Sequence, residues 1–311
     1  MPSFLAMFPG QGSQFVGMGK ELLGEFPDVR VIFEEAEDAA RIPVRKLCFD
    51  GPEDDLKLTA NTQPCILTVS IAYWRILTKE AGVTPALFAG HSLGEYSALV
   101  AAGKLEFSRA VYLVRMRGEA MQKAVPQGLG SMAAVMGSGV ETLEPLCKSI
   151  SSANSVVEVV NYNSPQQLVV AGHKAAVDAL SRELEKDNIR SIMLPVSAPF
   201  HSSLMGPARE GMTPLLNDTK FIKNNTKVVA NITGKIEEPY DASFLIRQMD
   251  GPVLWMQSLQ TASEWGCDTY LEVGPGRVLF GLARRVLPRE AKLMHVEDLK
   301  RTIQDLLIVR S

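Results

Sequence analysis

The stretch Gly90-His91-Ser92-Leu93-Gly94 organises this chain. An apolar run at 86–89 precedes it and a helix-forming run at 95–102 follows it, so the order is strand, sharp turn and helix. A serine between two glycines at such a turn projects from the end of a strand, on strained backbone. The nearby helix N-terminus favours a developing oxyanion. Ser92 is therefore a candidate acyl-accepting nucleophile, with an ordinary glycine-rich loop as the alternative.

Composition limits the possible classes of protein. The chain has 311 residues, 46% hydrophobic and 22% charged, which is enough for one large domain or two smaller ones. The net charge of −3 is too small to favour nucleic acid or a membrane surface as a partner. The apolar start lacks a basic region and no run has membrane-spanning length, so we expect a cytoplasmic protein. The widely spaced cysteines predict buried free thiols and no metal site: Cys48, Cys65, Cys147 and Cys267.

Strand and helix patterns alternate along most of the chain. The strands are expected at 3–8, 85–90, 227–230, 268–273 and 292–296, with helices between them. This alternation predicts an α/β fold with a mostly parallel sheet covered on both faces. Residues 51–55 are expected to form a polar loop, and Pro64 is expected in the first turn of a long helix ending near Lys79.

The pattern changes after residues 126–128. From 131 to 196 the order is strand, helix, strand, strand, helix, strand, which is the order of a ferredoxin-like unit. We therefore predict a ferredoxin-like small subdomain at 128–198, inserted into a larger subdomain formed by 1–127 and 199–311.

A serine nucleophile needs a proton acceptor within hydrogen-bond reach. His201 lies in a loop at a segment boundary, where catalytic groups tend to lie. His295 lies near the C-terminus, where the base of a hydrolase triad falls, with Asp178 or Asp241 as its acid. Both bases stay open on this reasoning, with His201 favoured. The four histidines of the chain are His91, which is expected to point away from the serine, His173, in a turn, His201 and His295.

Arg117 shares a largely apolar helix face with residues 113, 114 and 121. A guanidinium there needs an anionic partner, either a structural carboxylate or the carboxylate of a substrate. A structural pair is favoured, because paired arginines are common, and helix geometry alone makes Arg115 nearly as good a candidate.

Several motifs together resemble the malonyl-CoA:acyl carrier protein transacylases of type II fatty-acid synthesis. They cover essentially the full length of the chain, in the same order as in that family. The resemblance implies an α/β-hydrolase-like large subdomain carrying the ferredoxin-like insertion. The motifs are Gly10-Gln11-Gly12-Ser13-Gln14, Gly90-His91-Ser92-Leu93-Gly94-Glu95, Arg117, Asn161-Tyr162-Asn163-Ser164-Pro165, Pro199-Phe200-His201-Ser202 and Glu272-Val273-Gly274-Pro275-Gly276.

The resemblance implies a role for each of six residues. Ser92 would attack the thioester of malonyl-CoA, and His201 would act as its base. In the family a backbone carbonyl orients the histidine, and the matching residue is Gln248. The remaining roles are two oxyanion-hole N–H groups and a binding group for the malonyl carboxylate: Gln11, Leu93 and Arg117.

The resemblance also implies the substrates. Malonyl-CoA would donate the acyl group, acyl carrier protein would accept it, and no cofactor or metal is needed. Phe200 beside His201 matches the malonyl pattern more than the methylmalonyl pattern. We expect a monomer. The alternatives are an esterase or thioesterase of the α/β-hydrolase type that uses His295, and a malonyl transferase of polyketide synthesis.

Overall fold

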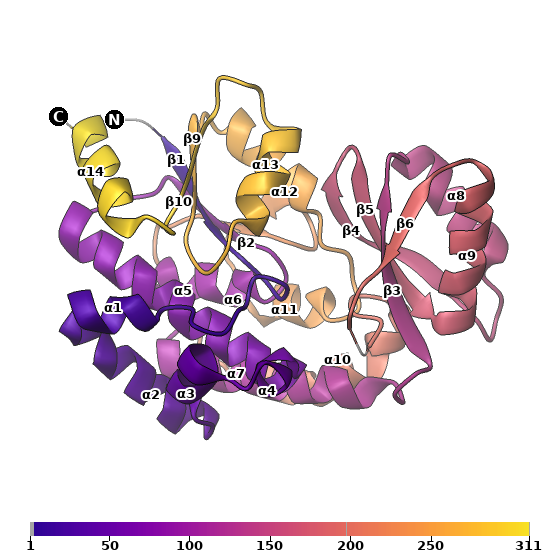
Figure 1. Ribbon diagram of the computed structural model, residues 1–311, viewed down its shortest axis with the longest axis horizontal. Helices are drawn as coiled ribbons and strands as arrows, with labels where there is room; N and C mark the ends of the chain where they lie inside the picture. Colours follow the sequence, from indigo (N-terminus) through magenta and orange to yellow (C-terminus); the bar gives the residue numbers. More distant parts are fainter. Residues whose placement is uncertain (1–2, 197, 311) are drawn as a thin grey trace.

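The computed structural model describes residues 3–196 and 198–310, which form two sheets with separate helical layers (Figure 1). Five neighbouring strands of the larger sheet pair in parallel, and the sixth, β8, is antiparallel to β7. The predicted mixed α/β fold with a mostly parallel sheet is confirmed. In spatial order the larger sheet contains β10 (Lys292–His295), β9 (Thr269–Glu272), β1 (Phe4–Phe8), β2 (Leu87–Gly90), β7 (Val228–Ala230) and β8 (Lys235–Ile236).

Both faces of the larger sheet are buried. In β1, Phe4 and Phe8 face one core cluster, whereas Leu5 and Met7 face another. This alternation follows from the two-residue repeat of a strand, and burial on both faces is typical of parallel sheets. The helices of the large part are α1 (Lys20–Glu25), α2 (Arg30–Ala40), α3 (Val44–Asp50), α4 (Glu53–Lys57), α5 (Thr59–Ala81), α6 (Gly94–Ala101), α7 (Phe107–Ala124), α10 (Gly206–Asn217), α11 (Ala242–Gln248), α12 (Trp255–Glu264), α13 (Val278–Val286) and α14 (Leu299–Arg310), with short 3₁₀ turns η1 (Pro27–Val29) and η2 (Ser203–Met205).

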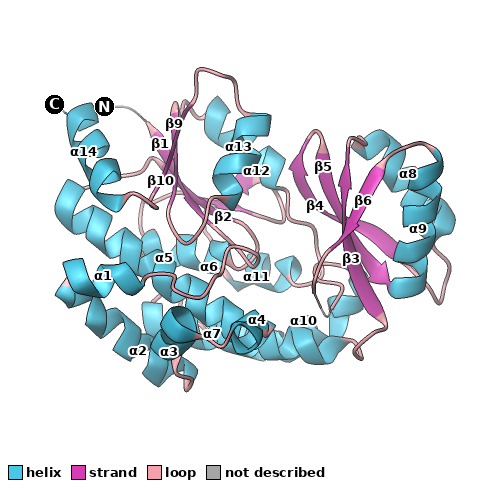
Figure 2. Ribbon diagram, viewed as in Figure 1, coloured by secondary structure: helices cyan, strands magenta, loops and turns pink. Residues whose placement is uncertain are grey.

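The smaller sheet is fully antiparallel, and its two helices cover the face turned away from the larger sheet (Figure 2). Ala133 and Val135 pack under these helices, whereas Met132 and Ala134 face the main core. Its elements in chain order are β3 (Gly130–Met136), α8 (Val140–Ile150), β4 (Val157–Ser164), β5 (Gln167–His173), α9 (Lys174–Lys186) and β6 (Arg190–Met193), and the strands lie in the order β4-β5-β3-β6.

Two local predictions were wrong. Most of the expected loop at 51–55 belongs to α4, because three acidic residues from Glu53 onward suit the positive end of a helix. The long helix α5 begins earlier than expected, because the carbonyl of Leu58 accepts the N–H groups of Asn61 and Thr62 at 2.7 and 2.8 Å. Pro64 therefore lies in the second turn.

All four cysteines are free and buried, as predicted. Within residues 3–196 and 198–310, none of the helices combines the length and apolar character that a bilayer crossing requires.

Candidate active site

The sharp turn between β2 and α6 holds Ser92 on left-handed backbone, with φ at +54°. The strand and helix approach so closely that a Cβ on Gly90 would lie 1.9 Å from the Gly94 carbonyl. A Cβ on Gly94 would lie 2.0 Å from the backbone oxygen of Phe8. Glycine is therefore required at both positions, and the serine projects from the carboxyl edge of the sheet.

Asn231, directly after β7, fixes this turn. Its Oδ1 accepts the N–H of Ser92 at 2.7 Å, and its Nδ2 donates to the carbonyl of Gly90 at 2.6 Å. One fully buried amide thus ties both sides of the turn to the neighbouring strand.

The Ser92 hydroxyl lies 2.7 Å from Nε2 of His201. The other ring nitrogen, Nδ1, lies 2.9 Å from the backbone oxygen of Gln248. A carbonyl only accepts, so Nδ1 carries the proton and Nε2 is free to accept from the serine. Burial, reinforced by the nearby Arg117 charge, lowers the pKa of His201 to about 3. His201 is therefore a neutral imidazole at physiological pH.

Arg117, from the middle of α7, points at the same serine. Its Nη2 donates to Ser92 Oγ at 3.1 Å and to Gln248 Oε1 at 3.0 Å, and its Nη1 donates to Gln63 Oε1 at 2.9 Å. The side chain is 1% exposed, and its Nε has no partner among the described residues. Burial lowers the pKa of the guanidinium.

The partners of Arg117 are neutral, and within the described residues it forms no ion pair. Arg115, two residues earlier, pairs instead with Glu119 at 2.9 Å and donates to Asn61. The structural carboxylate expected for Arg117 is therefore absent from the described ion pairs, and Arg115 has one instead. The negative charge of Glu95 also acts on Arg117, but without a direct ion pair, so the guanidinium beside the serine remains suited to pairing with a negatively charged ligand.

The loop after β1 packs directly against the turn. A Cβ on Gly10 would lie 2.4 Å from the carbonyl oxygen of His91, so Gln11 lies next to Ser92 and Leu93. The N–H groups of Gln11 and Leu93 have no acceptor among the described residues. Both residues line the small cavity that contains Ser92.

This cavity has a volume of about 100 Å³ and lies between the two sheets. Phe200 forms part of its apolar wall. His91 contributes to the lining of the cavity, and its Nε2 hydrogen-bonds Asn163 Oδ1 at 2.8 Å, away from the Ser92 hydroxyl as expected. The lining residues come from both parts of the chain: Gln11, Gln63, His91, Ser92, Leu93, Arg117, Met121, Met132, Asn161, Leu194, Val196, Phe200 and His201.

Sequence reasoning missed a buried carboxylate under the site. Glu95, 1% exposed, accepts hydrogen bonds from Gln248 Nε2 at 2.5 Å, the Tyr240 hydroxyl at 2.7 Å and the N–H of Asn231 at 3.1 Å. Burial raises its pKa to about 7. The only signal in the sequence is an acidic residue inside an apolar helix directly after the serine motif.

The alternative triad is not assembled. His295 ends β10, three strands from β2 and so about 14 Å away at ordinary strand spacing. Asp178 pairs with Lys174 on α9, and Asp241 caps α11 through Ser243. His173 accepts the N–H of Val156 within the smaller sheet.

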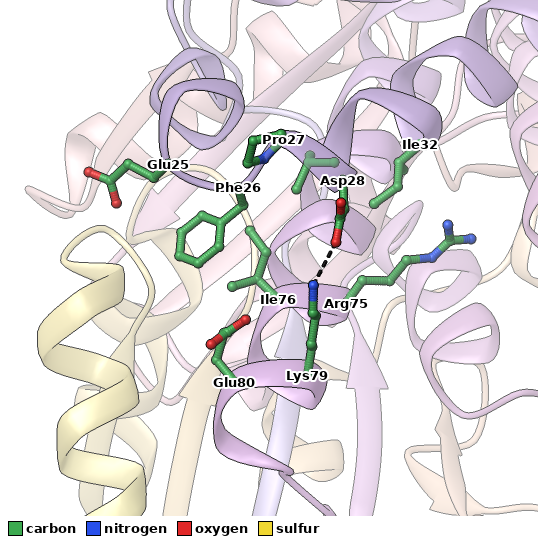
Figure 3. Close-up of a pocket in the computed structure, with 10 residues that line it drawn as sticks. Glu25, Phe26, Pro27, Asp28, Ile32, Arg75, Ile76, Lys79 and Glu80 are labelled. Carbon is green, nitrogen blue, oxygen red and sulfur yellow. Dashed lines mark hydrogen bonds and ion pairs between the residues drawn. The ribbon is translucent and has the colours of Figure 1, made fainter.

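A larger cavity of about 490 Å³ lies between η1, α2 and α5 (Figure 3). Phe26 and Ile76 supply apolar walls, and Asp28 pairs with Lys79 at 2.5 Å across its rim. None of the candidate catalytic residues lines it. Among the described residues there is also no cluster of three or more His, Cys, Asp or Glu side chains that could hold a metal ion.

A parallel-sheet fold with a serine on a strained turn, paired with a histidine, is typical of enzymes that transfer or hydrolyse acyl groups. Comparison with known proteins decides between these classes. Residues 6–303 match the acyl transferase domain family, so the chain belongs to that family and is an acyltransferase.

Individual relatives cover almost the whole chain. A malonyl CoA-acyl carrier protein transacylase of Bacillus subtilis is 42% identical over 302 residues, which span 96% of this chain and 94% of the relative. The crystal structure of malonyl-CoA:acyl carrier protein transacylase (FabD) from Xanthomonas oryzae pv. oryzae matches with a TM-score of 0.94 at 35% identity, covering 98% of each chain. PlMCAT, the malonyl-transacylase solved with the type II polyketide acyl carrier protein AntF, matches with a TM-score of 0.89 at 40% identity, covering 94% of this chain and 95% of that one.

Proposed function

We propose that this protein transfers the malonyl group from malonyl-CoA to the pantetheine thiol of an acyl carrier protein, through a malonyl-Ser92 intermediate. One observation carries the proposal. The buried guanidinium of Arg117 lies 3.1 Å from the nucleophilic oxygen and has no carboxylate partner among the described residues. A malonyl carboxylate would supply that partner in a two-pronged, charge-assisted contact.

In the first half-reaction, Nε2 of His201 takes the proton of Ser92 as Oγ attacks the thioester carbonyl. The C–S bond breaks, and the leaving coenzyme A sulfur takes the proton from His201. The backbone N–H groups of Gln11 and Leu93 bind the oxyanion of the tetrahedral intermediate. The backbone carbonyl of Gln248 keeps the imidazole in the reactive tautomer.

The substrate itself strengthens the base. The Arg117 charge is one of the causes that lower the pKa of His201. Burial lowers this pKa most, so pairing of the malonyl carboxylate with Arg117 removes only the smaller, repulsive contribution, and the pKa of His201 rises to that extent. A substrate without a carboxylate leaves the repulsion in place.

In the second half-reaction, His201 takes the proton of the carrier-protein thiol as its sulfur attacks the malonyl ester. The bond between Ser92 Oγ and the acyl carbon breaks, and His201 returns the proton to Oγ, which gives ping-pong kinetics. The small cavity around the ester disfavours attack by water. The mechanism needs no cofactor. We keep the cytoplasmic location and the monomeric state as predictions.

We also propose the subdomain division predicted from the sequence. Residues 128–198 would form a ferredoxin-like unit inserted into an α/β-hydrolase-like unit of 1–127 and 199–311. The strand order β4-β5-β3-β6 supports the first description. The entry and exit of the insertion lie together, since a Cβ on Gly130 would be 2.3 Å from Cδ of Pro199.

The acceptor has two candidates. The FabD relative favours the carrier protein of fatty-acid synthesis, whereas the match to PlMCAT bound to AntF favours a polyketide carrier protein as a second possibility. Both candidates share the pantetheine thiol, and comparison of the rates with the two purified carriers separates them.

The test is incubation with malonyl-CoA, first alone and then with holo-acyl carrier protein, followed by intact-mass spectrometry. We expect a malonyl adduct on the enzyme at Ser92 that disappears as malonyl-carrier forms. Absence of the adduct contradicts the proposal. Release of free malonate at the same rate without carrier protein shows a thioesterase instead.

A further inference from the structure

Glu95 lies behind the side chains of Ser92, His201 and Arg117 and does not line the cavity that contains them. Its three donors come from segments far apart in sequence: Asn231 after β7, Tyr240 before α11 and Gln248 at the end of α11. Within the described residues Glu95 forms no direct ion pair, although the charge of Arg117, on the other side of the Gln248 amide, also favours its ionised form. A fully buried carboxylate without an ion-pair partner is costly to stability, so a compensating role in the site is expected.

The contacts of Gln248 show what that role is. Its amide Nε2 faces two oxygens, Oε2 of Glu95 at 2.5 Å and the backbone oxygen of Ser92 at 3.0 Å. Its amide Oε1 faces the Nη2 donor of Arg117 at 3.0 Å. Each contact matches a donor to an acceptor in only one orientation of the amide.

We infer that Glu95 is a positioning residue that orients the Gln248 amide, and through it the Arg117 guanidinium, and so sets the preference for acyl groups that carry a carboxylate. This inference rests on the proposed malonyl transfer. Glu95 acts through Gln248 and touches neither the substrate nor the reacting atoms.

Glu95→Gln changes the hydrogen-bond pattern with little change in shape. Tyr240 and Asn231 both donate to Oε1, so the new amide keeps its oxygen there and turns its NH₂ toward Gln248. Two NH₂ groups then face each other. If the Gln248 amide flips in response, its NH₂ faces the guanidinium of Arg117 and its oxygen faces the carbonyl of Ser92. Either arrangement displaces Arg117 from the position in which it meets a malonyl carboxylate.

The readout is the ratio of acylation rates with malonyl-CoA and acetyl-CoA, measured by intact mass on the full chain. We expect Glu95→Gln to lower malonylation about 10- to 100-fold, as for loss of a well-placed charge-assisted contact, and acetylation less than threefold. Glu272→Gln is the matched control, because Glu272 is equally buried and lies outside the cavity. It should leave the ratio unchanged. Equal losses with both acyl donors in Glu95→Gln overturn the inference, because a merely structural role lowers both.

A double-mutant cycle with Gln248→Met tests the route through the amide. The Met side chain has no amide, while the backbone carbonyl that holds His201 stays in place. In this background Glu95→Gln should have no further effect on the ratio, and an undiminished effect overturns the inference.

If Glu95→Gln does not fold, Glu95→Asp supplies the same test, since the shorter carboxylate withdraws from Gln248. A wild-type enzyme that forms no malonyl adduct rejects the proposed function itself, whereas an intact adduct with an unchanged ratio in Glu95→Gln rejects only this inference.

Discussion

Two turns at the same edge of the larger sheet have similar local sequences and different surroundings. The first joins β2 to α6 through Gly90–Gly94, and the second joins β9 to α13 through Gly274–Gly276. Each is a strand, a glycine-rich turn and a helix, and each is accompanied by one fully buried glutamate. Burial raises the pKa of Glu95 and of Glu272 to about 7.

The two glutamates use their oxygens differently. Glu272 accepts the N–H groups of Leu279 and Phe280 at 3.0 and 2.7 Å, so it occupies the N-terminus of α13. Glu95 lies in α6 and accepts from three distant segments, while the Leu93 N–H before α6 has no acceptor among the described residues. The N–H groups at a helix N-terminus are free to bind a substrate oxyanion only where the nearby carboxylate accepts its hydrogen bonds from other groups. We therefore place the proposed catalytic groups at the first turn, whereas the second turn contributes to the stability of the fold.

The largest expected effect is that of removing Ser92, the proposed nucleophile in the first turn. Ser92→Ala should reduce malonyl transfer by at least ~10⁴-fold, because residues of a nucleophile–base unit contribute together. The measurement is malonyl-carrier formation by intact mass, with no enzyme adduct in the variant. Ser97→Ala, in the helix α6 that follows the turn, is the matched control, because its buried hydroxyl has no partner among the described residues. Transfer at more than a few per cent of the wild-type rate in Ser92→Ala would mean that another group carries the acyl chain.

The second largest effect is expected at Arg117, which should make the site selective for acyl groups that carry a carboxylate. Arg117→Ala should lower kcat/KM for malonyl-CoA by ~10²- to 10⁴-fold, since two charge-assisted hydrogen bonds are lost, and acetyl-CoA far less. Arg115→Ala on the same helix removes a structural pair with Glu119 and should affect both acyl donors alike. Equal losses of malonyl and acetyl transfer in Arg117→Ala would assign Arg117 a structural role.

Each turn also has a histidine near it, and their pH behaviour should differ. Because the pKa of His201 lies at about 3, His201 stays neutral down to pH 5. The kcat/KM for acetyl-CoA, which depends little on Glu95 and Arg117, should therefore change less than about twofold between pH 5 and 6, where a base with the ordinary histidine pKa loses roughly eightfold. His295 lies opposite Glu272 in the register of the neighbouring strands β10 and β9, beside the second turn. His295→Ala should therefore leave this profile unchanged. An eightfold loss in the wild type would contradict a buried neutral base.

The sequence predicts the two turns better than it predicts their difference. Glycine spacing and strand periodicity locate Ser92 within its own segment, because those signals are local. The partners that distinguish the turns are not local. Asn231 reaches the N–H of Ser92 across 139 residues of chain, and Gln248 reaches Glu95 across 153. Nothing near Asn231 or Tyr240 in the sequence indicates which carboxylate or backbone group each meets.

Errors of local prediction had local causes. Pro64 is displaced into the second turn of α5 because Leu58 starts the helix earlier, through backbone bonds that composition does not report. The choice between His201 and His295 could not be made from the residues alone. It depends on strand order, which places His295 at the far edge of the larger sheet.

The smallest effect on activity is expected at the second turn, where the change should appear in stability. A pKa raised from 4.5 to about 7 means that the folded state favours protonated Glu272. This contribution to stability is fully present below pH 4.5 and is lost as the pH rises through about 7. The free energy of unfolding of the wild type, relative to Glu272→Gln, should therefore fall by on the order of 3 kcal/mol between pH 4.5 and pH 8.

Urea unfolding at both pH values measures this difference in stability, and malonyl transfer by the folded variant should stay within about threefold of the wild type. A difference that is independent of pH would show that the two N–H groups of α13 keep Glu272 ionised throughout, and a changed malonyl-to-acetyl ratio would remove the distinction between the two turns.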